Sequence, residues 1–310
     1  MKCNMKKNKL DETIIVLFHG GLGNQMYQYC FYRWLGERYP NKRILADISE
    51  YRTIECHQGF ELVKIFPHLK LNIATNYELY KIYGEIPRIY SGIGKSFVEN
   101  KIRKKINNNL FGSNVENIYE EPADCTYIDV QEAIKERKKY FSGYWQNKFF
   151  FLTCKNILLK EFVFSDIKDS SNLKCLDLIE KNLSVSLHVR RGDYVDAGWP
   201  VLSMDYYYTA MAKIRDRVTN PLFFIFSDDV DYVEKKFADL KNKIVMRNNW
   251  GENSYIDMFL MSKCKHNIIA NSTFSIWAAL LNRNTEKIVI YPEQSKDKQK
   301  MLDGWIRIKA

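Results

Sequence analysis

Hydrophobic and polar positions along the chain alternate with the periods of strands and helices. In residues 184–189 (SVSLHV), serine and histidine alternate with valine and leucine, which is the period of a pleated strand. Near the N-terminus the sequence predicts a strand over 13–18, a helix over 26–39 and a second strand over 43–48. The order strand, helix, strand is the usual start of an α/β domain.

The C-terminal half alternates predicted helices with predicted strands. The strands are 184–190, 221–227, 243–246, 266–270 and 287–291. The helices that precede or separate them are 173–182, 204–218, 230–240, 253–263 and 274–281. This regular alternation predicts an α/β fold with a doubly wound, mostly parallel sheet.

The middle of the chain has a weaker pattern. We predict mostly helix over 50–135, a strand over 139–146 and a helix over 149–164. The polar segment 165–172 (SDIKDSSN) is the best candidate for a domain boundary. With 310 residues, 46% of them hydrophobic, the chain is long enough for two domains with separate cores.

Basic residues exceed acidic ones in this sequence. Forty-seven Lys and Arg against 37 Asp and Glu leave a formal charge of +10, which favours phosphates, nucleotides, an acidic membrane surface or nucleic acid as partners. Nucleic-acid binding would need a basic stripe with interleaved aromatic side chains. The Lys-rich stretch 93–106 offers only Phe97, so no nucleic-acid partner is expected.

The seven cysteines are scattered, odd in number and without a C-x-x-C pair. This pattern argues against a disulfide framework and a zinc site, and it indicates a reducing cytoplasm. The apolar run before His19 is too short for a signal peptide core, and no run reaches the roughly 18 residues of a membrane span. We expect a protein that is soluble or, at most, lies on a membrane surface.

Polar side chains follow three of the predicted strands at their carboxyl ends. They are Arg190, then Ser227, Asp228 and Asp229, and then Asn271, Ser272 and Thr273. Ligands of doubly wound sheets bind at this edge. The three clusters therefore predict a single binding site.

Strand alternation places Arg190 on the face of His188 and Arg191 on the opposite face. A guanidinium offers paired donors that fit a phosphate or a carboxylate, and it stays charged at any relevant pH. In one interpretation Arg190 binds a ligand phosphate while Arg191 pairs with Asp193 to brace the loop. The alternative is a structural Arg–Asp pair that caps the strand.

Two strand-to-helix segments have a structural interpretation beside the functional one. The segment 19–25 (HGGLGNQ) could meet a phosphate or a sugar, or it could be a tight turn with Asn24 as helix N-cap. It matches neither G-x-G-x-x-G nor a P-loop. The segment 270–281 (ANSTFSIWAALL) could hold phosphate oxygens through its hydroxyls and amides, or form an ordinary capped helix start.

The segment 226–231 (FSDDVD) allows three interpretations. Asp229 and Asp231 form a D-x-D pair that could hold a divalent metal against a nucleotide diphosphate. Asp228 or Asp229 could instead accept hydrogen bonds from the paired N–H donors of guanine. Acidic residues are also favoured at a helix start by the helix dipole.

Four motifs, in their order along the chain, resemble one known family. They are GGLGNQMYQY (20–29), HVRRGDY (188–194), FSDD (226–229) and NSTFSIWAALL (271–281). Together they resemble the bacterial α-1,2-fucosyltransferases of glycosyltransferase family 11 over nearly the whole chain. The second and fourth motifs are the specific ones, and the other two support them.

The resemblance implies a GT-B-type fold with two Rossmann-like domains. We expect an N-terminal α/β domain over 1–165 on the acceptor side and a GDP-fucose-binding domain over 166–292. A C-terminal segment over 293–310 could return to the N-terminal domain.

The same resemblance implies the roles of the site residues. Arg190 would bind the donor pyrophosphate and stabilise the departing charge. The resemblance does not transfer the role of the general base, and Asp193 is our candidate second catalytic residue because it follows the two arginines. Such enzymes work without an essential metal, so no cofactor is expected and the D-x-D interpretation falls. The expected donor-binding residues are Asn24, His188, Arg190, Arg191, Asp228, Asp229, Asn271, Ser272, Thr273 and Ser275.

The implied reaction moves L-fucose from GDP-fucose to the 2-hydroxyl of a terminal β-galactose, with inversion. The acceptor could be a lipid-linked oligosaccharide, in which case the stretch 93–106 could contact an anionic membrane from the cytoplasmic side; otherwise that stretch is a solvated helix. Two rivals are a nucleotide-sugar transferase with another donor or linkage and a non-catalytic nucleotide- or glycan-binding module.

Overall fold

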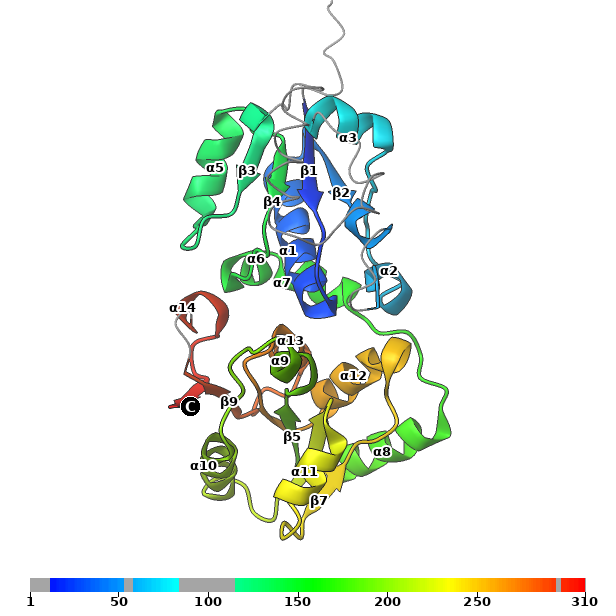
Figure 1. The fold of residues 1–310 in the computed structure, drawn as a ribbon, viewed down its shortest axis with the longest axis vertical. Coiled ribbons are helices and arrows are strands. Elements are labelled where there is room, and N and C mark those ends of the chain that lie inside the picture. The colour runs from blue at the N-terminus through cyan, green and yellow to red at the C-terminus, as the bar shows by residue number, and fades with distance from the viewer. Residues whose placement is uncertain (1–11, 53–57, 84–114, 294–296, 310) are drawn as a thin grey trace, which may run out of the picture. The chain divides into compact units, whose positions relative to one another are not determined.

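The chain forms two compact units, each with its own parallel sheet (Figure 1). The first unit holds residues up to 64 and 68–161, and the second holds 65–67 and the chain from 162 onward. This computed structural model describes residues 12–52, 58–83, 115–293 and 297–309.

The stretch 93–106, for which the sequence left a solvated helix and a membrane contact open, lies outside the described residues. In the part of the chain that is described, no helix is both long and apolar enough to cross a membrane. The five cysteines within it are all buried free thiols.

The first unit has a four-stranded parallel sheet in the order β2-β1-β4-β3. Its strands are β1 (Thr13–Leu17), β2 (Arg43–Asp47), β3 (Ile118–Glu120) and β4 (Tyr140–Ser142). Its helices are α1 (Leu22–Arg38), α3 (Asn76–Tyr83), α5 (Tyr127–Lys135), α6 (Lys148–Thr153) and α7 (Lys155–Glu161), and α2 (Leu62–Ile65) reaches its boundary.

Helix α1 is buried over most of its length because aromatic side chains surround it. The ring of Phe31 stacks on Trp145 with centroids 3.8 Å apart, and Phe150 meets the same ring edge-on. The helix begins at Leu22 after Gly21, whose backbone is extended. The interpretation of Asn24 as the N-cap is therefore wrong.

Two predictions for the middle of the chain are also wrong. Residues 50–135, where described, mix short helices with irregular segments and the strand β3, which forms through its pairing with β4. The predicted helix 149–164 is broken at Cys154, which caps α6, and helical structure ends at Glu161.

The second unit has a six-stranded parallel sheet in the order β10-β9-β8-β5-β6-β7. Its strands are β5 (Ser184–Val189), β6 (Leu222–Ser227), β7 (Lys243–Val245), β8 (His266–Ile268), β9 (Val289–Pro292) and β10 (Ile306–Ile308). Its helices are α8 (Ser170–Lys181), α9 (Gly192–Asp196), α10 (Met204–Arg215), α11 (Val230–Lys236), α12 (Tyr255–Lys263), α13 (Thr273–Leu281) and α14 (Asp297–Lys300).

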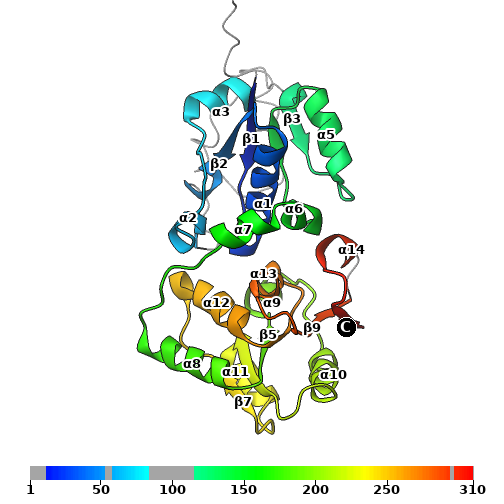
Figure 2. The ribbon, with the colours of Figure 1, turned by 180° about the vertical axis from the view of Figure 1, so that it is seen from behind.

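Helices cover both faces of this sheet, α10 on one side of β5 and α8 with α12 on the other (Figures 1 and 2). The first face contributes Leu187 and Ile225 to a core shared with Tyr206 of α10. The opposite face carries Asn267, whose amide donates to Ser186 Oγ and to the Met261 carbonyl of α12. The predicted fold class, α/β with a doubly wound, parallel C-terminal sheet, is confirmed.

The described strand of the C-terminal segment, β10, belongs to the sheet of the second unit. Residues 306–308 pair in parallel with β9, and Ile308 is buried in the same core as Tyr206. The reason is that an apolar edge strand gains more by extending this sheet than by remaining alone.

The strand order reverses next to β5, because the chain continues from β5 to β6 and β7 on one side and then crosses to β8 on the other. Such a reversal opens a crevice between the carboxyl ends of the two central strands. Arg190 directly follows β5, and Asn271 lies three residues after β8 ends, so both lie at the sheet edge where such folds bind ligands.

Candidate active site

Arg190 lies at the carboxyl end of β5 and forms an ion pair with the loop that follows β6. Its Nη1 is 3.0 Å from Asp228 Oδ2, and about a quarter of each side chain is exposed. The guanidinium carbon also lies 5.6 Å from the ring centre of Tyr194. A partly exposed guanidinium at a topological switch point can bind a phosphate.

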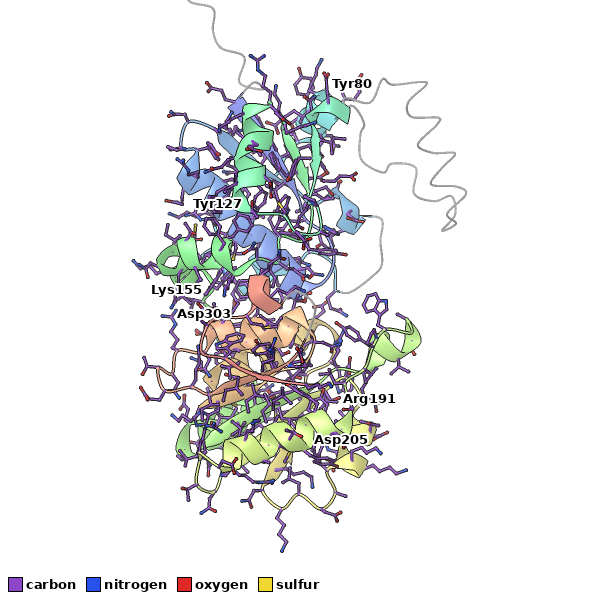
Figure 3. The ribbon with its side chains drawn as sticks, turned by 90° about the vertical axis from the view of Figure 1, so that its left-hand side faces the viewer. Tyr80, Tyr127, Lys155, Arg191, Asp205 and Asp303 are labelled. Atoms are coloured by element: carbon purple, nitrogen blue, oxygen red, sulfur yellow. The ribbon has the colours of Figure 1, made fainter. Side chains whose placement is uncertain are left out.

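Arg191 contacts α11 and its N-cap residue. Its Nε donates to Asp229 Oδ2 at 3.0 Å, and its guanidinium lies over the Tyr232 ring at 3.6 Å; Figure 3 labels this arginine. The structure thus gives Asp229 as a partner of Arg191, and the pairing with Asp193 considered from the sequence stays a prediction. Asp193 belongs to α9, but its side chain lies outside what the structure describes.

Asp228 connects the two arginines. One carboxylate oxygen pairs with Arg190, and the other accepts the backbone N–H of Arg191 at 2.8 Å. A Cβ on Gly192 would lie only 3.0 Å from this carboxylate, so the turn has room for glycine alone unless Asp228 moves. The carboxylate therefore fixes the start of the loop that carries Arg190.

His188 is a buried, neutral imidazole on the same strand face as Arg190. It is 4% exposed, and burial, with the nearby Arg190 charge, lowers its pKa to about 3. Its Nδ1 is buried without a hydrogen-bond partner among the described residues, and its ring centre lies 5.9 Å from that of Phe274 at the start of α13. An unsatisfied buried nitrogen is costly, and a ligand group that bonds it would remove that cost.

Asp229 is committed to protein groups. Besides its contact with Arg191, it is the N-cap of α11, and its Oδ1 accepts the Tyr232 N–H at 3.1 Å. Its own N–H donates to Ser227 Oγ at 3.0 Å. Within the described ranges, no group of three His, Cys, Asp or Glu side chains could hold a metal.

The turn after β8 combines structural and free polar groups. Ser272 is the N-cap of α13, and the fully buried Ser275 hydroxyl accepts from Ala270 N at 3.1 Å and donates to the Ser272 carbonyl. Thr273 is partly exposed. Ser275 thus braces the turn, which leaves Thr273 as the hydroxyl that a ligand could reach.

Asn271 joins this turn to the segment after α9. Its Nδ2 donates to the Pro200 carbonyl at 2.9 Å, and its own carbonyl accepts from the Tyr194 hydroxyl at 3.0 Å. The Asn271 Oδ1 is buried and unpaired among described groups. The structure therefore brings together the clusters after β5, β6 and β8, as the sequence predicts.

Asn24 belongs to the first unit, in the turn between β1 and α1. Its Oδ1 accepts from Gln146 Nε2 at 2.8 Å. Two buried amides fix this turn: Gln25 donates to the Gly20 carbonyl, and Gln28 donates to the His19 carbonyl. The turn is thus rigidly braced at the carboxyl end of β1.

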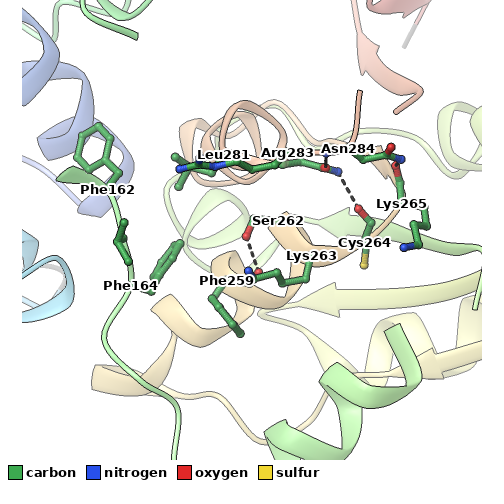
Figure 4. A pocket seen from close by; sticks show the side chains of 12 residues that line it. Phe162, Phe164, Phe259, Ser262, Lys263, Cys264, Lys265, Leu281, Arg283 and Asn284 are labelled. Atoms are coloured by element: carbon green, nitrogen blue, oxygen red, sulfur yellow. Dashed lines mark hydrogen bonds between the residues drawn. The ribbon is translucent and has the colours of Figure 1, made fainter. Parts of the chain in front are cut away.

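A cavity of about 600 Å³ lies elsewhere on the second unit (Figure 4). It is formed where α12 and α13 end, next to the amino end of β8, and so at the opposite sheet edge from Arg190. Phe162, Phe164 and Phe259 line it together with the cations Lys263, Lys265 and Arg283. The cavity is separate from the candidate active site.

Three residues of the site were not predicted from sequence. Tyr194, Trp199 and Tyr232 place aromatic rings against or near the arginines. The available signal was Tyr194, the aromatic residue that directly follows the Arg-Arg-Gly-Asp sequence. An aromatic side chain at that position also suits a hydrophobic core.

A doubly wound parallel domain with arginine at its switch point is a class of fold that binds phosphorylated ligands. The chain matches the model of glycosyl transferase family 11 over residues 13–309, and it belongs to this family. The family resemblance seen in the sequence is thereby confirmed, and the chain is a glycosyltransferase.

Individual relatives agree with this assignment. The chain is 33% identical over 306 residues to the O-antigen biosynthesis glycosyltransferase WbnK of Escherichia coli, covering 93% of this chain and 98% of that protein. It is 30% identical over 321 residues to an alpha-1,2-colitosyltransferase of Escherichia coli, covering 95% and 98%. Over 152 residues it is 30% identical to galactoside alpha-(1,2)-fucosyltransferase 2 of Mus musculus, covering 46% and 44%.

Proposed function

We propose that this glycosyltransferase moves L-fucose from GDP-fucose to the 2-hydroxyl of a terminal β-galactose, with inversion and without a metal ion. One observation carries the proposal: a partly exposed Arg190 at the switch point, beside the buried and unsatisfied His188. A diphosphate fits the first group, and a purine base fits the second because a neutral imidazole can donate or accept a hydrogen bond.

Arg190 acts on the leaving group. The acceptor hydroxyl attacks the anomeric carbon from the face opposite GDP, the bond to the β-phosphate oxygen breaks, and negative charge accumulates on that oxygen. A guanidinium aimed there stabilises the transition state more than the ground state. Donor binding requires Arg190 either to exchange Asp228 for phosphate or to hold both. In the first case Asp228 Oδ2 becomes available to guanine.

Asp193 is the proposed acceptor of the hydroxyl proton, because it lies in the short helix that directly follows Arg190 and Arg191. The proposed acceptor is a galactose-terminated oligosaccharide of O-antigen type, either free or attached to a lipid carrier. The relative that is named as an O-antigen biosynthesis glycosyltransferase supports this class of acceptor.

A second candidate donor sugar is colitose, the 3-deoxy counterpart of L-fucose. The observation in its favour is the alpha-1,2-colitosyltransferase that shares 30% identity over 95% of this chain. Both candidates keep the same nucleotide, linkage and attacking hydroxyl. They differ only in one hydroxyl of the transferred sugar.

The test is release of GDP from GDP-fucose and from GDP-colitose with a β-galactoside acceptor, followed by NMR of the product linkage. We expect EDTA-resistant turnover and an α-1,2 product, with Arg190→Ala lowering kcat by about 10²–10³. Arg247→Ala is the matched control, since Arg247 is an exposed arginine of the same unit that pairs with Glu234.

Each other outcome contradicts part of the proposal. Loss of turnover in EDTA would restore the metal interpretation of Asp229 and Asp231. Turnover with GDP-colitose alone would replace the donor sugar. GDP binding without turnover on any galactoside would indicate another acceptor or a non-catalytic module.

A further inference from the structure

Trp199 is an exposed aromatic side chain close to the candidate active site. It is 56% exposed, and its ring packs edge-on against Tyr194 with centroids 5.2 Å apart. Tyr194 in turn lies 5.6 Å from the guanidinium carbon of Arg190. A single aromatic ring therefore separates the exposed indole from the cation proposed to bind the diphosphate.

The backbone on both sides of Trp199 is held in place although the indole itself is exposed. Its N–H donates to the Tyr194 carbonyl at 2.7 Å, and the carbonyl of the next residue, Pro200, accepts from Asn271 Nδ2 at 2.9 Å. Gly198 before it adopts a left-handed φ of 68°. The backbone that carries the indole therefore needs little further ordering when a ligand arrives.

An exposed indole offers a flat apolar face with negative electrostatic potential. One face of a pyranose ring carries C–H groups that are weakly positive and apolar, and it matches the indole in size and polarity. A protein partner would need an interface of about 1,000 Å² or more. Near Trp199 the exposed apolar surface includes Val195, at 51% exposure. A surface of this size suits a single sugar ring better than a protein partner.

We propose that Trp199 is a positioning residue that stacks on a pyranose of the glycosyl transfer reaction. This inference rests on the proposed function. The sugar is either the one carried by the nucleotide or the terminal sugar of the acceptor, and both present the same C–H face. Stacking holds that ring beside Arg190 while the glycosidic bond is exchanged.

The experiment compares Trp199→Ala, Trp199→Phe and Trp250→Ala with the wild type. Trp250 is the matched control because it is 55% exposed in the same unit, while its Nε1 donates to the Arg247 carbonyl in its own turn. Steady-state KM and kcat are measured for the nucleotide-sugar and the β-galactoside. Affinity for GDP alone is measured by isothermal titration calorimetry.

We expect Trp199→Ala to raise one KM by about tenfold, Trp199→Phe to restore most of it, and GDP affinity to stay unchanged. A rise in the KM of the nucleotide-sugar assigns the stack to the donor sugar. A rise in the galactoside KM assigns it to the acceptor. Trp250→Ala should leave both constants unchanged.

Equal kinetics for Trp199→Ala and Trp250→Ala, in a wild type that turns over, would overturn this inference and leave the proposed function standing. Loss of GDP affinity in Trp199→Ala would also overturn it, because the residue would then act on the nucleotide or on the fold. If the wild type binds GDP but transfers no sugar, the proposed function itself fails.

Discussion

At the scale of single residues, the site keeps a neutral group and a cation side by side. His188 and Arg190 share a strand face, and a second positive charge there would be repelled. Burial, reinforced by Arg190, therefore lowers the pKa of His188 to about 3. The imidazole stays uncharged through the physiological range, so it can pair with a base edge without competing for phosphate.

This lowered pKa predicts a pH-dependent stability. Because the folded pKa lies below the unfolded value near 6.5, the contribution of His188 is complete above about pH 6.5 and is lost as the pH falls toward about 3. Between about pH 7.5 and about pH 5, the wild type should lose about 2 kcal/mol of unfolding free energy more than His188→Gln. Urea unfolding of both proteins at the two pH values measures this. Equal losses would mean that His188 is accessible to protons in the folded state.

At the scale of elements, the ends of β5 and β6 are joined by two ion pairs, Arg190–Asp228 and Arg191–Asp229. Asp229 both caps α11 and pairs with Arg191. Asp229→Ala removes both interactions, whereas Asp229→Asn keeps a good N-cap and loses only the charge. We expect Asp229→Ala to be less stable than Asp229→Asn by about 1 kcal/mol in urea unfolding. Identical stabilities would show that the cap contributes nothing to α11.

The elements of the second unit were predictable because its strands are short apolar runs separated by helices of ordinary length. The strand predicted at 184–190 is observed at 184–189, and the helix predicted at 253–263 begins two residues later. The pairing of Arg191 was not predictable, because it depends on β6 lying beside β5, and Asp193 was the nearer carboxylate in sequence. For the same reason β3 was not predictable from the local sequence, because this strand forms by pairing with β4.

At the scale of the whole molecule, each unit has its own sheet and its own core. Of the predicted site residues, Asn24 belongs to the first unit, and those at the ends of β5, β6 and β8 belong to the second. A ligand that binds only the folded second unit should stabilise that unit by mass action. The two units are therefore expected to respond differently to GDP.

Calorimetric unfolding with two core variants tests this expectation. Ile15→Ala removes fully buried side-chain volume in the first unit, and Ile225→Ala does so in the second. Each variant should therefore lower the free energy of unfolding of its own unit by about 2–5 kcal/mol. GDP at about 100 times its Kd should raise the free energy of unfolding of the second unit, the unit that Ile225→Ala destabilises, by about 2.7 kcal/mol. If GDP instead stabilises the unit that Ile15→Ala destabilises, or both units equally, the first unit must contribute to nucleotide binding, and Asn24 is the residue of that unit predicted from the sequence to do so. Arg190→Ala should abolish the GDP effect and leave both transitions otherwise in place.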